Sequence, residues 1–199
     1  MTTFRFCVLL LGLAAGACSQ APAPQVPAPV SPPREARQAA SRDWSGVPAD
    51  LLGEADEAGY MEVDWTAMLP PEELKAIEEG TVPEVRHSGT RRMPQFGTYR
   101  VVDAVLGRPM RLPGYVVPLE SDDAGLIEFL FVPYFGACIH VPPPPPNQIV
   151  HVRLARPIEM PDMYTPFYLA GKLRAEHHED GLAGSAYSMD EARLLTYEK

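Results

Sequence analysis

A cysteine and a histidine stand two residues apart, at Cys138 and His140, just before five consecutive prolines. If this segment is a strand, side chains two residues apart lie on the same face. A thiolate and an imidazole on one face suit zinc or copper, so the pair predicts half of a metal site. The same pair could act as a nucleophile and its base. The alternative is a buried thiol beside a histidine that bonds to the backbone.

The prolines that follow, Pro142–Pro146, have no backbone N–H and fix φ near about −65°. Five of them form a polyproline II rod of about 15 Å. Because proline cannot pair in the middle of a sheet, we expect the rod at a sheet edge or on the surface. It is either a rigid connector or a ledge beside a pocket. The predicted pocket residues are Tyr134, Cys138, His140, Asn147 and Gln148.

Other polar groups give weaker signals. His177 and His178 are adjacent, so on a strand they would point to opposite faces and could not chelate one ion together. We expect them in a solvated loop over residues 175–185. The sequence has no phosphate-binding glycine loop, G-x-S-x-G elbow or H-E-x-x-H motif, which removes these enzyme classes without excluding an enzyme.

Two sequence segments resemble those of a known family: LPGYVVPLE at residues 112–120 and EFLFVPYFGACIHVPPPPPNQIVHV at residues 128–152. From Trp65 to Tyr197 the chain resembles a bacterial family catalogued as domain of unknown function 3299. The resemblance implies a secreted or lipid-anchored envelope protein, of a kind sometimes encoded near export-type ABC transporters or metal-responsive genes. It supplies no catalytic residues to transfer.

Residues 1–17 have the pattern of a secretory signal peptide. A basic Arg5 precedes an apolar core from Phe6 to Leu13, which is too short to span a membrane. Residues 15–18, Ala-Gly-Ala-Cys, match a bacterial lipobox, which predicts Cys18 as the lipidated first residue of the mature chain. The alternative is ordinary cleavage after Ala17, which would leave Cys18 as a plain thiol.

The segment after Cys18 fits a lipoprotein. Residues 19–33 are rich in proline and alanine and carry no charge, so we predict that residues 18–58 form a tether and a flexible lead-in. Ser19, in place of an aspartate, favours the outer membrane over the inner one. The expected location is therefore the periplasmic side of the cell envelope, with the lipid anchor in the membrane.

The net charge argues against one class of partner, and the cysteine count argues against a disulfide. The net charge is −9, with 17 basic and 26 acidic residues, which argues against nucleic acid because phosphate binding needs clustered Lys and Arg. Of the three cysteines, Cys7 leaves with the signal peptide and Cys18 is acylated. Cys138 is then alone, and no disulfide forms within the mature chain.

Short apolar segments with turn residues between them predict a mainly β domain over residues 59–199. We expect a small antiparallel barrel or sandwich, OB-like with Greek-key connections and one or two short helices. The expected helix is 72–79, and 187–197 is either a last strand or a helical turn. The expected strands are 98–106, 110–119, 127–133, 149–154 and 166–174. The expected core residues are Phe129, Phe131, Val150, Val152, Phe167 and Leu169.

Together these patterns favour a non-enzymatic binding or accessory module of the envelope that serves a transport or metal-homeostasis system. Its partners would be the membrane and an envelope transport protein. The alternative is a small thiol-dependent or metal-dependent enzyme that uses Cys138 and His140, with zinc or copper as the candidate cofactor.

The lipobox makes a direct prediction. Mass spectrometry of the N-terminal peptide of the mature protein should show Cys18 carrying a diacylglyceryl group, because the lipobox places the cleavage site just before this residue. An N-terminal peptide with an unmodified Cys18 would refute the lipid anchor.

Overall fold

The computed structural model describes residues 44–80 and 95–197. The predicted signal peptide, Cys18 and the tether up to residue 43 lie outside these residues. The described strands are β1 Leu52–Ala55, β2 Met61–Val63, β3 Pro109–Asp122, β4 Gly125–Val132, β5 Val150–Ile158, β6 Phe167–Glu179 and β7 Gly184–Thr196. The described helical elements are η1 Ala49–Leu51, η2 Trp65–Met68, α2 Pro71–Glu78, η3 Asp103–Val105 and η4 Pro146–Gln148. None of the helices in this part of the chain is long and apolar enough to cross a membrane.

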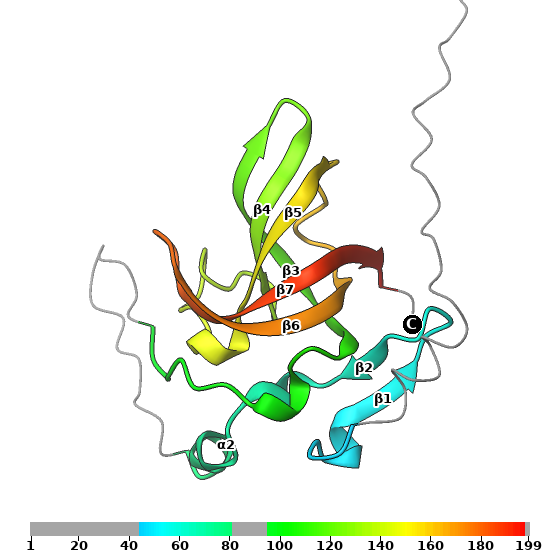
Figure 1. The fold of residues 1–199 in the computed structure, drawn as a ribbon. Helices are drawn as coiled ribbons and strands as arrows, with labels where there is room; N and C mark the ends of the chain where they lie inside the picture. Colours follow the sequence, from blue (N-terminus) through cyan, green and yellow to red (C-terminus); the bar gives the residue numbers. More distant parts are fainter. Residues whose placement is uncertain (1–43, 81–94, 198–199) are drawn as a thin grey trace, which may run out of the picture. The chain divides into compact units, whose positions relative to one another are not determined.

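Five strands close into a barrel (Figure 1). β3 pairs with β4 along one part of its length and with β6 along another, so the order β3-β4-β5-β7-β6 returns to its start. β5 and β7 run parallel, and the other barrel pairs run antiparallel. β2 adds to β3 in parallel and β1 pairs with β2, which extends the sheet outside the barrel. The predicted mainly β barrel is confirmed, but its expected antiparallel pairing fails between β5 and β7.

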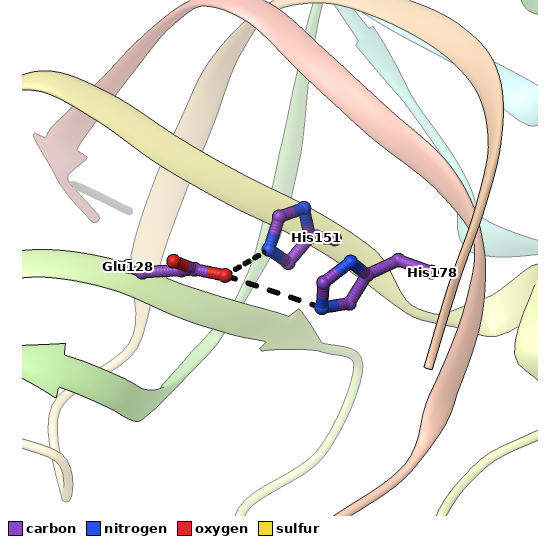
Figure 2. Close-up of side chains that lie close together, drawn as sticks. All are labelled: Glu128, His151 and His178. Atoms are coloured by element: carbon purple, nitrogen blue, oxygen red, sulfur yellow. Dashed lines mark hydrogen bonds and ion pairs between the residues drawn. The ribbon is translucent and has the colours of Figure 1, made fainter. Parts of the chain in front are cut away.

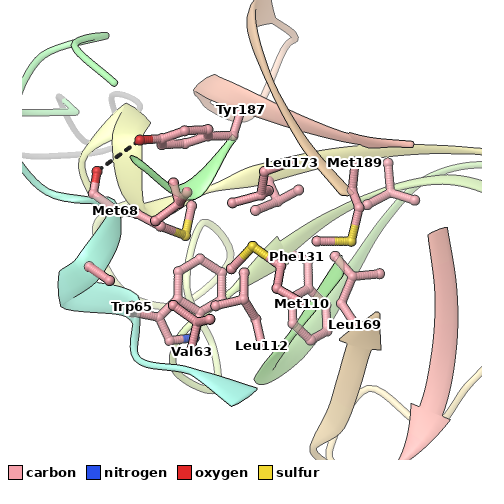
Figure 3. Packing of buried hydrophobic residues seen from close by; sticks show 14 of the residues in the cluster. Val63, Trp65, Met68, Met110, Leu112, Phe131, Leu169, Leu173, Tyr187 and Met189 are labelled. Carbon is pink, nitrogen blue, oxygen red and sulfur yellow. Dashed lines mark hydrogen bonds between the residues drawn. The ribbon is translucent and has the colours of Figure 1, made fainter. Parts of the chain in front are cut away.

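The barrel is filled by side chains that alternate along its strands, as the period of two requires. Of the predicted core residues, Phe167 is half-buried and packs at the edge of the cluster, while the other five are fully buried in it. Figure 3 shows this packing, with Met110 and Leu112 from β3 beside Phe131 and Leu169. The prediction of one β core is therefore confirmed.

Two aromatic side chains connect the irregular segments to the barrel. The Trp65 indole N–H donates to the Pro113 carbonyl at 2.6 Å, and its ring stacks on Phe131 with centroids 6.1 Å apart. The buried Tyr187 hydroxyl donates to the Met68 carbonyl at 3.0 Å and accepts from the Val102 N–H at 2.8 Å. Burial raises the pKa of Tyr187 to about 12, so the hydroxyl stays protonated at neutral pH.

Several described residues before residue 59 pack against the barrel. Trp44 and Val47 are buried in the main core cluster, and Leu51 and Leu52 pack against it. The described part of the predicted lead-in, residues 44–58, therefore packs with the domain and is not part of a tether. The physical reason is the apolar area that these side chains remove from water.

The helix and one hairpin follow their local sequence signals. α2 begins at Pro71 with acidic residues in its first turn, one residue before the predicted start. The β3–β4 hairpin turns at Gly125, whose φ is 130°. A Cβ there would come within 1.9 Å of the Ile158 carbonyl oxygen, so only glycine fits the turn.

The structure differs from two of the predicted elements and shows which of two alternatives holds for a third. Residues 98–106 are not a strand, because Val102 gives its N–H to the Tyr187 hydroxyl and residues 103–105 turn in η3. The predicted loop at 175–185 is mostly strand, because β6 and β7 continue pairing out to Glu179 and Gly184. Of the two alternatives for residues 187–197, the strand is confirmed as part of β7.

Of the two positions expected for the proline rod, a sheet edge or the surface, the surface is wrong. Pro143, Pro144 and Pro146 are buried. Gln95 covers the run: its side-chain amide donates to the Pro144 carbonyl and to the Gly184 carbonyl, both at 2.8 Å. The proline run therefore lies beneath residues 95–97. These residues cover its apolar rings and supply a hydrogen-bond donor to the Pro144 carbonyl.

The core makes a matched pair of predictions. Phe131→Ala should lower the free energy of unfolding by about 3–5 kcal/mol, because it empties a fully buried site. Phe135→Ala should cost less than about 1 kcal/mol, since that ring is 47% exposed. Urea denaturation of both variants measures the difference, and equal losses would contradict this assignment of the core.

Candidate metal centre

Two polar side chains on the barrel wall face away from the core. Phe129 and Val152 point into the barrel, so the alternation along β4 and β5 turns Glu128 and His151 outward. Glu128 lies opposite Arg153, and His151 lies two residues along the same face. Both Glu128 and His151 are only 8% exposed, so the outer wall is covered at this point.

A third side chain reaches this position from β6, which is separated from β5 by β7. The imidazole of His178 stacks on that of His151, with ring centroids 3.7 Å apart and the planes 17° from parallel. Figure 2 shows the two rings side by side, both with a nitrogen directed at Glu128. His178 is the most accessible of the three, with 31% of its side chain exposed.

One carboxylate oxygen serves both histidines. The Glu128 Oε1 lies 2.6 Å from the His151 Nε2 and 4.0 Å from the His178 Nε2. The other oxygen, Oε2, accepts from Arg153 Nη1, and the same guanidinium lies 3.4 Å from Glu120. Oε1 is therefore the oxygen left to face the imidazoles.

The electrostatics keep this carboxylate ionised. Burial alone would raise the pKa of Glu128, but the hydrogen bond with His151 and the nearby cation of Arg153 outweigh burial and lower it. At neutral pH the cluster therefore contains an ionised carboxylate beside two imidazole rings.

These three groups match the ligand chemistry of zinc. One ligand atom from each of Glu128, His151 and His178 lies within 4.8 Å of the others. In the part of the chain that the structure describes, this is the one group of three such residues that meets that criterion. Two histidines and one carboxylate, with a position open to water or another ligand, form a known type of zinc site.

Of the two adjacent histidines, only His178 belongs to the cluster with Glu128 and His151, because His177 points away from it. It points the other way from β6, and its ring lies 3.9 Å from that of Tyr99, centroid to centroid. The Tyr99 hydroxyl donates to Glu179 at 2.8 Å, so Glu179 also lies on the side of β6 that carries His177. The expected opposite orientation of the two histidines is confirmed, although they lie on a strand and not in a loop.

The structure places Tyr134, Cys138 and His140 in one turn, not on a strand. The N–H groups of His140 and Val141 both donate to the Gly136 carbonyl, at 2.8 and 3.2 Å. Gly136 and Cys138 have positive φ values of 79° and 66°. The argument that Cys138 and His140 share a strand face is therefore wrong, whereas metal binding by the pair stays a prediction.

The other two predicted pocket residues lie elsewhere. Asn147 is buried and donates to Glu73 at 2.9 Å, and Gln148 donates to the Trp65 carbonyl at 2.9 Å. Both hold η4 against η2 and α2. A pocket does lie beside the turn, and His140 is the predicted pocket residue among its lining side chains.

Sequence reasoning missed the cluster of Glu128, His151 and His178. One signal was available: Glu128 and His151 are outward positions in two strands whose inward positions are apolar. No sequence pattern indicated that His178 would lie beside Glu128 and His151, because their meeting depends on the order of the strands and on the length of β6.

Comparisons with known proteins agree on one family. The family model described as Protein of unknown function (DUF3299) matches residues 65–196. A crystal structure of a DUF3299 family protein from Pseudomonas aeruginosa PAO1 is 34% identical, with a TM-score of 0.50. That match covers 69% of this chain and 97% of the other. No curated protein matches the chain.

The cluster predicts a large stability difference between two glutamates that pair with the same arginine. Glu128→Ala should lower the free energy of unfolding by about 2–4 kcal/mol, because it leaves the buried His151 without its partner. Glu120→Ala should cost less than about 1 kcal/mol, since 54% of that side chain is exposed. Urea denaturation in the presence of a chelator measures both, and a loss at Glu128 as small as that at Glu120 would count against the buried network.

Proposed function

Because the chain belongs to the DUF3299 family, whose description assigns no activity, we propose a function from its own geometry: it is an envelope module that binds zinc at Glu128, His151 and His178. The observation that carries the proposal is the convergence of three ligand atoms from three strands within 4.8 Å. Local sequence does not bring them together; the closed barrel does.

The distances favour a site that a small movement completes. Around a tetrahedral zinc ion with bonds of about 2.0–2.1 Å, neighbouring ligand atoms lie roughly 3.3 Å apart. The Glu128 oxygen is 2.6 Å from one imidazole nitrogen and 4.0 Å from the other. One separation must therefore widen and the other close by about 0.7 Å each. His178, the most exposed ligand, can close the longer separation, whereas the shorter one widens only if Glu128 or His151 shifts.

Arg153 would act as the outer partner of the bound carboxylate. It holds Oε2 of Glu128 and leaves Oε1 for the metal, which fixes the orientation of the ligand. The set of two nitrogens and one oxygen suits zinc better than the softer copper(I), which prefers sulfur.

We propose that this module works at the periplasmic side of the outer membrane, held there by lipidated Cys18. The support is the lipobox and the uncharged segment at residues 19–33. A non-enzymatic role as the accessory protein of an envelope transport or metal-homeostasis system fits a surface-accessible metal ligand. Nucleic acid is not the proposed partner, because the net charge is −9.

An OB-like, Greek-key arrangement of the barrel is also proposed. In its support, the order β3-β4-β5-β7-β6 closes on itself, and the third and fifth strands of the barrel are parallel. OB-folds bind ligands on the face of their second and third strands, between loops from either side. In this chain that face is β4 and β5, which carry Glu128 and His151.

A second candidate function uses the turn at residues 134–141. His140 lines a pocket and Cys138 lies in the same turn with a left-handed backbone, a conformation that is often found at functional sites. A thiol-dependent or metal-dependent enzyme that uses these two residues, with zinc or copper, is therefore retained as the alternative.

Calorimetric titration of the full chain with zinc tests the proposal. The wild type should bind one zinc ion, and His178→Ala should bind it at least about tenfold more weakly because it lacks one ligand. The matched control is His177→Ala, the adjacent histidine on the opposite face, which should bind like the wild type. Equal binding by wild type and His178→Ala would refute the site.

The same titration separates the two candidate sites. His140→Ala and Cys138→Ser should leave zinc binding unchanged if the cluster on the barrel wall is the site. If these variants lose binding while His178→Ala keeps it, the turn is the metal site and the alternative function is favoured.

A further inference from the structure

The exposed apolar side chains are concentrated in one place. Among the described residues, eight large hydrophobic side chains are exposed, and seven of them come from residues 134–141 and 160–164. Both segments contribute to one pocket, beside residues 115–117 of β3. An exposed apolar surface of this kind often marks a binding site. We call it the aromatic pocket, and the side chains that line it include Tyr115, Phe135, Ile139, His140, Met163 and Tyr164.

Three aromatic rings line this pocket as consecutive neighbours. Tyr115 meets Phe135 with ring centroids 6.0 Å apart and the planes at 65°, and Phe135 meets Tyr164 at 5.3 Å and 34°. Because the rings are tilted against one another, their faces look in different directions. The face of an aromatic ring is the negative part of its quadrupole and attracts a cation. A group of such faces is the surface that proteins use to recognise quaternary ammonium groups.

The charges around the pocket have the sign that a cation requires. Residues 134–141 and 159–165 contain no lysine or arginine, and Glu159 and Asp162 are exposed. Asp162 accepts from the Tyr164 N–H at 3.0 Å and from the Thr165 hydroxyl at 2.7 Å, which holds its carboxylate beside the backbone of an aromatic residue of the pocket. These hydrogen bonds lower the pKa of Asp162, so it is ionised at neutral pH. The electrostatics therefore favour a cationic ligand over a neutral or anionic one.

The lining selects among cations. A primary ammonium is strongly hydrated and needs hydrogen-bond acceptors when it leaves water. Of the side chains that line the pocket, only Tyr115, His140 and Tyr164 carry a polar group. A quaternary ammonium has no N–H to satisfy, and its methyl groups can pack against apolar side chains such as Ile139 and Met163. The pocket therefore suits a quaternary ammonium better than a primary one.

The acidic residues also distinguish two sources of this group. A quaternary ammonium occurs in soluble compounds such as choline and in the headgroup of phosphatidylcholine. The headgroup carries a phosphate close to its ammonium, and Glu159 and Asp162 would repel that phosphate. Choline carries only the positive charge, so the soluble compound is favoured.

We propose that the aromatic pocket binds a small soluble quaternary ammonium compound of the choline type, whose charge lies against the faces of Phe135 and Tyr164. None of the proposed zinc ligands lines this pocket, so the proposal does not rest on zinc binding.

Titration of the full chain with choline, followed by NMR spectroscopy, tests the proposal. The matched ligand is the neutral analogue of choline in which a carbon atom replaces the nitrogen, because it has the same shape without the charge. Choline should bind at least about fivefold more tightly than this analogue, since attraction to the rings depends on the charge. No binding of choline, or equal binding of the two ligands, would overturn the proposal. So would binding to phosphatidylcholine vesicles without binding of soluble choline.

Two pairs of variants locate the ligand. Tyr164→Leu should weaken choline binding at least about fivefold, whereas Tyr164→Phe, which keeps the ring, should bind like the wild type. Tyr164 is 70% exposed, so neither change disturbs the core. Asp162→Asn should weaken binding at least about twofold, whereas Glu54→Gln, which changes an exposed glutamate of β1 outside the pocket, should not. Unchanged binding by Tyr164→Leu or by Asp162→Asn would overturn the proposal.

Discussion

The closure of the barrel through β3 is the constraint on which the rest of the structure depends. This strand gives residues 109–114 to β6 and residues 115–122 to β4, so the ring of backbone hydrogen bonds has no open edge there. Every residue in a closed wall points either into the core or out of it. Phe129 fills the interior, which forces the neighbouring Glu128 outward, where its charge can be paired. The polar cluster is thus a consequence of how the core is packed.

The sequence was informative where the period of two decided the structure. Strands 110–119, 127–133 and 149–154 and the core around Phe131 could be predicted, because their apolar side chains must alternate or be buried. Residues 98–106 carry similar apolar side chains, yet the Tyr187 hydroxyl takes the Val102 N–H and no ladder forms. This hydrogen bond joins two residues that are 85 positions apart, so no local sequence pattern could predict it.

The candidate site was harder to predict for the same reason. The turn at residues 136–138 depends on positive φ at Gly136 and Cys138, and a cysteine in that conformation is not indicated by its neighbours. The meeting of His178 with His151 depends on β7 lying between β5 and β6, which is a property of the topology. Residue types at short spacing therefore pointed to Cys138 and His140, while long-range pairing assembled a different cluster.

A second, smaller apolar cluster contains residues from β4, from the β6–β7 hairpin and from the turn at residues 136–141. Leu130 of β4 lies opposite His151, Ala183 lies in the hairpin that carries His178, and Ala137 lies in the turn that lines the pocket with His140. All three belong to this one cluster. The β6–β7 hairpin and the turn at residues 136–141 therefore pack against the same small group of buried side chains. His178, which would close on Glu128 in the proposed zinc site, is carried by the same hairpin, so the packing of this small cluster helps to set its position.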